Sequence, residues 1–249
     1  MPRQADNKQK IVEQLRQQLL HMQGNGHPTG QGCPMGLGPI ERAFPHGVFP
    51  TACIHEFVTF NAEEAAATSG FVSGLLARMV AQGGTCLWIG ASPRLAPFPP
   101  ALAAFGIAPE RIVFVEVKRE RDILWAMEEA LKSTALTAAV TEVSSMDFVQ
   151  SQRLQLAVEK SRVTGFVLRN QPLGLGNTAS AARWHIRHLP SLLEAGMPGV
   201  GFPRWEVELL KVRNGNPGRW TVGWSGIQFA PPQRAEKPVH WPLESKQIG

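Results

Sequence analysis

The last third of the chain interleaves basic side chains with tryptophans, a combination that can bind phosphates, nucleic-acid bases or other proteins. Arginine beside an aromatic ring suits phosphate pairing and base stacking, and both residue types are enriched where protein interfaces bind most strongly. The residues that we predict to contact a partner or DNA are Arg183, Arg187, Trp205, Lys211, Arg213 and Arg219. Three further tryptophans lie among them, Trp184, Trp220 and Trp224. Core packing is the alternative for these rings, and we expect it for at least two of the four.

The distribution of charge agrees with a basic contact surface. The formal net charge of the chain is +5. Residues 151–249 carry thirteen Lys and Arg against six Asp and Glu, a balance of +7, whereas residues 1–150 carry twelve against fourteen, a balance of −2. A basic half can face an anionic partner such as DNA, and its affinity for DNA would then fall steeply with salt. A solvated basic surface without a ligand is an equally weighted alternative.

One stretch stands where an α/β protein would hold a nucleotide phosphate, and its residues do not suit that chemistry. Phosphates favour the first junction between a strand and a helix, where backbone N–H groups form an anion cradle. Residues 58–70 read VTFNAEEAAATSG at that junction. A nucleoside-triphosphate loop needs the pattern G-x-x-x-x-G-K-[ST], whereas this segment has no lysine and places Glu63 and Glu64 where they would repel a triphosphate. We therefore predict a protein that is not an enzyme and that has no cofactor.

A divergent ATPase is one alternative function. In that case Thr68, Ser69 and Gly70 would touch the phosphate. Glu142 would handle the metal ion, and Arg94 would replace the missing lysine. Glu142 is weak support, because the apolar run that contains it has no Asp and the simpler interpretation is a strand-edge residue in a loop.

Cysteine usage and hydropathy indicate a reducing compartment. The three cysteines, Cys33, Cys53 and Cys86, are an odd number without C-x-x-C spacing, so no zinc site is predicted. The N-terminus is polar and Gln-rich rather than apolar like a secretory signal, and no run of about 18 apolar residues occurs. We expect a cytoplasmic protein that does not span a membrane.

An alternation of strands and helices beginning near residue 52 must position these residues. Apolar runs rich in β-branched and aromatic residues predict strands at 52–58, 85–90, 111–117, 137–143 and 164–170. Helical periodicity predicts helices between them, at about 62–82, 97–105, 120–134 and 147–161. Near-continuous apolar strands joined by helices indicate an α/β fold with a mainly parallel sheet that helices cover on both faces.

After residue 178 strands follow one another through turns, so we expect them to extend the sheet in antiparallel fashion. The clearest signal is the turn NGNPG at residues 214–218. Its asparagines and glycines tolerate positive φ and its proline fixes φ, as a tight reversal requires. The pattern predicts a hairpin between Leu209–Arg213 and Trp220–Trp224.

The chain divides into four predicted parts. These are an N-terminal amphipathic helix over 1–22, a Gly/Pro-rich linker over 23–38, the α/β domain over 39–230 and a flexible C-terminal tail over 231–249. The helix is predicted because Ile11, Leu15, Leu19 and Met22 recur at helical spacing. Such a tethered helix docks on a partner or on its own domain.

Together these segments resemble the RecA-like ATPase domain and, within it, the ImuA family of damage-inducible accessory proteins for translesion synthesis. The resemblance covers about residues 8–230. It rests on GPIERAFPHGVFPTACIHEF at the domain entry, TGFVLRNQ at the fifth strand, and then ARWHIRHLPS and RWEVELLKVRNGNPGRWTVGW. The last of these, a basic strand followed by a turn and a tryptophan strand, is the most specific.

The resemblance implies a bacterial cytoplasmic protein that associates with the nucleoid during DNA damage. It implies a non-catalytic role in SOS-induced translesion synthesis and mutagenesis, beside an ImuB-type polymerase-like protein and an error-prone DnaE-type polymerase, with RecA as a further candidate partner. Two departures from RecA agree with a role that needs neither ATP hydrolysis nor filaments. Residues 65–68 read AAAT where the phosphate loop aligns, and the segment 171–178 is shorter than the DNA-gripping loop of RecA. A DNA-binding module in repair is the remaining alternative.

Overall fold

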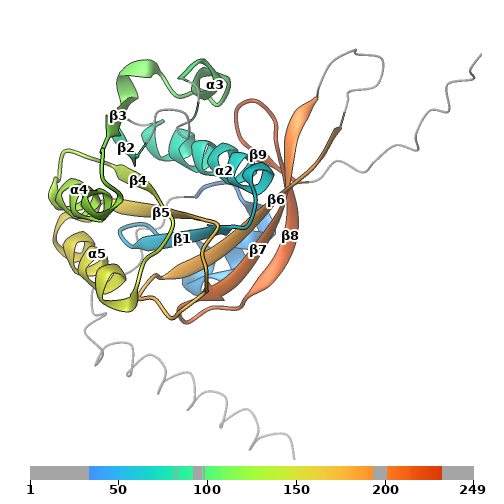
Figure 1. The fold of residues 1–249 in the computed structure, drawn as a ribbon. Coiled ribbons are helices and arrows are strands. Elements are labelled where there is room, and N and C mark those ends of the chain that lie inside the picture. The colour runs from blue at the N-terminus through green and yellow to red at the C-terminus, as the bar shows by residue number, and fades with distance from the viewer. Residues whose placement is uncertain (1–33, 82, 92–96, 98, 193–200, 232–249) are drawn as a thin grey trace, which may run out of the picture.

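The protein folds around one mixed sheet, shown as a ribbon in Figure 1. This computed structural model describes residues 34–81, 83–91, 97, 99–192 and 201–231. The predicted N-terminal helix, most of the predicted linker, nearly all of the predicted tail and Arg94 lie outside the described residues. Among the helices that the structure describes, none is both long enough and apolar enough to cross a bilayer.

The sheet confirms the predicted α/β class. Its strands lie in the order β3-β2-β4-β5-β1-β6-β7-β8-β9. Their bounds are β1 (Ile54–Thr59), β2 (Cys86–Gly90), β3 (Ile112–Glu116), β4 (Ala138–Val143), β5 (Thr164–Asn170), β6 (Ala182–Leu192), β7 (Phe202–Val212), β8 (Gly218–Trp224) and β9 (Phe229–Ala230). The pairs from β3 to β6 are parallel, and those from β6 to β9 are antiparallel.

Helices cover the two faces of the parallel strands (Figure 1). The helical segments are η1 (Gly38–Ala43), η2 (Pro45–Gly47), α2 (Ala62–Val80), α3 (Pro99–Ala104), η3 (Pro109–Arg111), α4 (Glu120–Lys132) and α5 (Phe148–Ser161). One core cluster joins α2 and η1 to the sheet, and a second joins α4 and α5 to the opposite face. Because both faces are covered, β1 and β4 are buried along their whole length, as their apolar sequences predicted.

A hairpin joins β7 to β8, but the predicted residues were wrong: Leu209 is the one residue of Leu209–Arg213 that pairs with β8, and Trp220 pairs with Val207. Strand β7 pairs with β8, and the last pair joins Leu209 to Gly218 rather than residues beside the turn. Lys211 and Val212 continue β7 by pairing with Arg183 and Ala182 of β6, after a register shift at Leu210. The connection is anchored instead to the N-terminal part of the domain, where the N–H of Asn216 donates to the carbonyl oxygen of Ala43 at 2.9 Å. A contact distant in sequence therefore sets the turn geometry.

Two residues of the segment predicted as a linker, residues 23–38, pack in the core of the domain. Met35 and Leu37 are buried in the same core cluster as η1 and α2. The N–H of Met35 donates to Oε1 of Glu41 at 2.8 Å, which fixes the entry to η1. High Gly and Pro content concealed these two apolar anchors.

Candidate functional site

The connection between β1 and α2 is too short to wrap a phosphate. Only Phe60 and Asn61 separate the last residue of β1 from the first residue of α2. Asn61 caps the helix, because its side chain accepts the N–H of Glu64 at 2.8 Å and its carbonyl accepts the N–H of Ala65 at 3.1 Å. The N–H groups that would bind an anion at this helix N-terminus are therefore already partly used.

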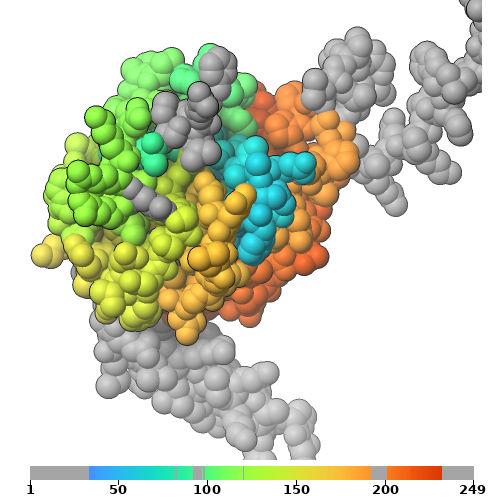
Figure 2. Space-filling model, in the orientation of Figure 1, coloured from blue at the N-terminus to red at the C-terminus, as the bar shows by residue number. Residues whose placement is uncertain are grey.

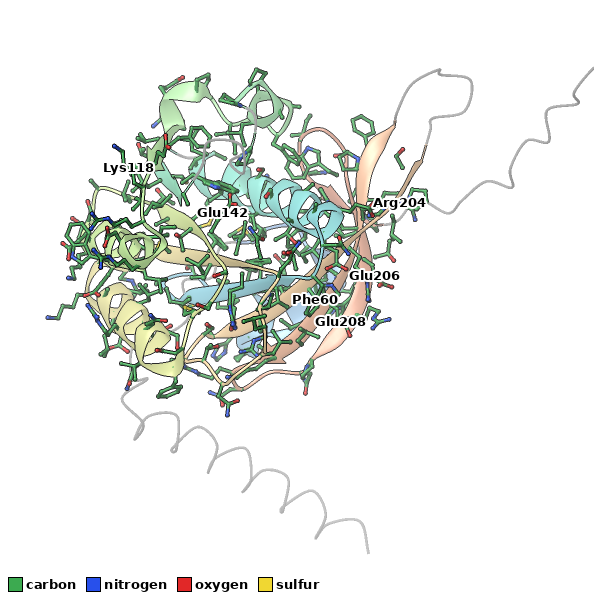
Figure 3. The ribbon with its side chains drawn as sticks, viewed as in Figure 1. Phe60, Lys118, Glu142, Arg204, Glu206 and Glu208 are labelled. Carbon is green, nitrogen blue, oxygen red and sulfur yellow. The ribbon has the colours of Figure 1, made fainter. Side chains whose placement is uncertain are left out.

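The carboxylate of Glu64 lies at this same helix start. It accepts the N–H of Phe60 at 2.8 Å and lies 3.1 Å from Nε2 of His185. Burial raises the pKa of Glu64, but the Phe60 N–H, His185 and Arg187 outweigh that effect and leave the pKa below its usual value. The ring of Phe60 meets His185 edge-on, and Nδ1 of His185 lies 3.8 Å from Glu208. Figure 3 labels Phe60 and Glu208 at this corner of the molecule.

Glu142 is buried in β4, so interpreting it as a loop residue at the strand edge was wrong. Its Oε1 accepts the indole N–H of Trp88 at 2.8 Å, and its Oε2 lies 3.4 Å from Nδ2 of Asn170. Asn170 in turn accepts the hydroxyl of Thr59 at 2.9 Å. Polar groups of three neighbouring strands, β4, β5 and β1, thus meet near their carboxyl ends. Figure 3 labels Glu142 among them.

Stability should fall as the pH rises through neutrality because of Glu142. Burial raises the pKa of this carboxyl group from 4.5 to about 7, against the lowering effect of Trp88 and Asn170. The folded protein therefore keeps a proton that the unfolded chain has released, and this stabilisation is complete below about pH 4.5 and lost as the pH rises through about 7. We expect the unfolding free energy to drop by on the order of 3 kcal/mol between about pH 5 and about pH 8.

Urea unfolding across this pH range in the wild type and in Glu142→Gln measures the effect. The variant cannot ionise at this position, so its stability should depend less steeply on pH. Equal pH dependence in the two proteins would contradict the assignment.

Three of the residues that a divergent ATPase would use lie inside a helix rather than in a phosphate loop. Thr68, Ser69 and Gly70 lie beyond the first turn of α2, where N–H groups are used within the helix. Thr68 is buried, and a Cβ added at Gly70 would lie 3.5 Å from the ring of Trp205. These positions serve packing between α2 and the sheet.

Basic residues that were predicted to bind a partner hold the connection between β5 and β6, which we call the crossover loop (residues 171–181). Parallel strands are usually joined by a helix that satisfies its own backbone, whereas this loop contains none. Side chains donate to four of its carbonyl oxygens: Arg169 to Gly174, Arg183 to Gly176, Lys211 to Thr178 and Arg213 to Ala179. Arg183, Lys211 and Arg213 therefore have partners inside the domain.

A buried carboxylate anchors the same loop. Glu56 in β1 is fully buried and pairs with Arg169 at 2.6 Å and with Arg183 at 3.0 Å. Its Oε2 also accepts the hydroxyl of Thr178 at 2.6 Å. One negative charge thus links β1, β5, β6 and the crossover loop.

The other predicted contact residues also have internal partners. Arg187 pairs with Glu206 at 2.6 Å and with Glu208 at 3.2 Å, and Arg219 pairs with Glu208 at 2.8 Å. Trp205 is buried in the core and is not available as a contact residue. Of the remaining tryptophans, Trp184 and Trp224 are buried and Trp220 packs partly buried against the same cluster, which confirms the core alternative.

The amino-acid sequence of this chain is similar to those of known proteins. No protein-family model matches the chain. Two relatives described as "Protein ImuA", from the CB15N and CB 15 strains of Caulobacter vibrioides, are each 33% identical over 199 residues. The alignment covers 75% of this chain and 81% of each relative. The chain belongs to the ImuA family.

In this ImuA-family chain the buried ion cluster was missed by sequence reasoning. The signal was present, because Glu56 and Arg169 each interrupt an otherwise apolar strand, and charged residues are seldom fully buried unless paired. Within the part of the chain that the structure describes, no three His, Cys, Asp or Glu side chains lie close enough together to bind a metal ion.

Proposed function

We propose that the chain is a non-catalytic accessory protein of damage-induced translesion synthesis that acts through protein contacts. Its partners in this proposal are an ImuB-type polymerase-like protein and a DnaE-type polymerase, with RecA as a further candidate. Membership of the ImuA family supports the pathway. The observation that carries the non-catalytic part is the two-residue connection between β1 and α2, which leaves no loop to enclose a triphosphate.

The internal pairing of basic residues weighs against DNA as the main ligand. Phosphate binding requires cations that can exchange protein or solvent partners for phosphate oxygens. Arg183 pairs with the buried Glu56, and Arg187 and Arg219 both pair with the partly exposed Glu208. The +7 balance of residues 151–249 does not count Glu56, which neutralises part of the charge of Arg169 and Arg183.

Association with the partners tests the proposal. We expect the full chain to retain an ImuB-type protein on affinity capture, and we expect nuclease treatment and added magnesium-ATP to leave the retained amount unchanged. Protein contacts need neither nucleic acid nor nucleotide, which is the physical reason for both expectations.

A control variant tests whether the acidic charge at the start of α2 is what makes capture independent of ATP. Removing an acidic charge with Glu63→Gln should leave the capture insensitive to ATP, because the short connection and not only the charge excludes the phosphate. Capture that requires ATP would contradict the non-catalytic role, and capture that nuclease abolishes would favour a DNA-binding module.

A further inference from the structure

The carboxyl ends of β4, β5 and β1 expose apolar side chains. Between 41% and 109% of the surface of each is accessible. We call them the carboxyl-edge patch, which consists of Phe60, Phe148, Val149, Leu173 and Leu175. Residues that leave a strand for the surface are usually polar, so apolar exposure on three successive strand ends suggests that something covers it.

Hydrogen bonds place these three segments side by side. The N–H of Gln171, which begins the crossover loop, donates to the carbonyl of Thr59 at 2.7 Å. The N–H of Ala179, near the end of the loop, donates to the hydroxyl oxygen of Ser151 in α5 at 2.9 Å. Figure 2 shows the crossover loop (gold) on the surface between the start of α2 (cyan) and α5 (yellow-green). The patch therefore extends over one face of the molecule.

The crossover loop presents its leucines on a fixed backbone. Arg169 and Arg183 donate to the carbonyls of Gly174 and Gly176, which flank Leu175. Because these arginines are themselves held by the buried Glu56, Leu173 and Leu175 cannot readily fold inward. A preorganised apolar surface loses little conformational entropy on binding, which favours a docking role.

The segments that carry the patch are acidic, and the cations that contact the crossover loop, Arg169, Arg183, Lys211 and Arg213, already donate to its carbonyl oxygens. Residues 59–67, 143–152 and 170–178, which form the three strand ends, contain Glu63, Glu64 and Asp147 and neither Lys nor Arg. An acidic border repels phosphate and attracts a segment that carries apolar side chains beside cations.

We propose that the carboxyl-edge patch binds residues 8–22 of the same chain. That segment reads KQKIVEQLRQQLLHM and carries Ile11, Leu15, Leu19 and Met22 at the spacing of one helix face. It also carries Lys8, Lys10 and Arg16 against the single acid Glu13. Its apolar stripe and its positive charge complement the patch, and the inference does not depend on the proposed function.

The intervening chain is long enough for this contact. Residues 23–33 span about 36–40 Å when extended, at about 3.3–3.6 Å per residue. The described chain begins at residue 34, and Met35 packs in the same core cluster as Trp184 of β6. From β6 to β4 is about 15 Å across three strands, and a six-residue strand is about 20 Å long, so the segment reaches the patch.

Hydrogen exchange on the full chain tests the contact with three variants. Leu173→Asp changes a fully exposed residue of the patch, and Leu15→Asp changes the centre of the segment. Ile227→Asp is the matched control, since it changes an equally apolar and exposed residue of the turn between β8 and β9. We expect amides of residues 8–22 to exchange at least about tenfold more slowly in the wild type and in Ile227→Asp than in the other two proteins.

Three outcomes would overturn the proposal. The first is equal exchange of residues 8–22 in all four proteins. The second is loss of protection in the control Ile227→Asp in addition to the other two variants. The third is protection that appears only at concentrations where light scattering detects a dimer. The last result would assign the segment to a second copy of the chain. Protection that persists in the monomer and weakens with added salt supports binding within one chain.

Discussion

Replacing Glu56 by glutamine should lower the unfolding free energy by about 3–5 kcal/mol, because it leaves two buried guanidinium groups without their counter-charge. Arg169 and Arg183 both contact this carboxylate, at 2.6 and 3.0 Å, and neither can reach bulk water without moving the crossover loop. Since domains are stable by only about 5–15 kcal/mol, the loss would be a large part of the total. Urea unfolding followed by tryptophan fluorescence measures it.

Glu206→Gln is the matched control for this substitution. Glu206 also pairs with an arginine, but both side chains of that pair are partly exposed to solvent. Such pairs contribute about 0–1 kcal/mol, so the control should unfold almost like the wild type. Similar stabilities for the two variants would show that the Glu56 cluster is not the anchor described above.

Replacing Trp184 by alanine should cost about 3–5 kcal/mol, the range expected when a large aromatic side chain leaves a packed core. The indole is fully buried, with its ring centroid 5.9 Å from that of Phe57 and 6.0 Å from that of Phe49. Its N–H donates to Nδ1 of His55 at 3.2 Å. Burial lowers the pKa of His55 to about 4, so the ring is neutral near pH 7 and can accept this hydrogen bond.

Two further variants separate packing from hydrogen bonding at this position. Trp184→Phe keeps most of the ring and leaves Nδ1 of His55 without its donor, for an expected cost of about 1–3 kcal/mol. Trp125→Ala removes an exposed indole of α4 and should change the stability by no more than about 0.5 kcal/mol. A Trp184→Ala variant as stable as Trp125→Ala would contradict the structural role of this ring in the core.

The sequence predicted the parallel part of the fold well, because its signal is local. Strands such as β4 and β5 are buried on both faces and therefore appear as apolar runs, and the start of α5 carries a capping box between Asp147 and Gln150. The predicted strand at 164–170 coincides with β5, and the other four predicted strands overlap β1 to β4 to within two residues at each end.

The roles of the basic residues could not be predicted in the same way, because their partners are remote in sequence. Arg183 and Glu56 are 127 residues apart, and only the placement of β6 beside β1 brings them together. Glu142 had looked like a loop residue for the same reason: Trp88 and Asn170, which surround it, belong to other strands. Side-chain composition alone therefore suggested a binding surface where the fold uses the cations internally.

The short connection after β1 also limits how the protein could change during evolution. The connection has two residues, whereas the phosphate-loop pattern has four residues between its two glycines, so an insertion would be required to form that loop. That insertion would also have to displace the Asn61 cap and separate Glu64 from His185. Single substitutions alone therefore do not give this junction a phosphate loop.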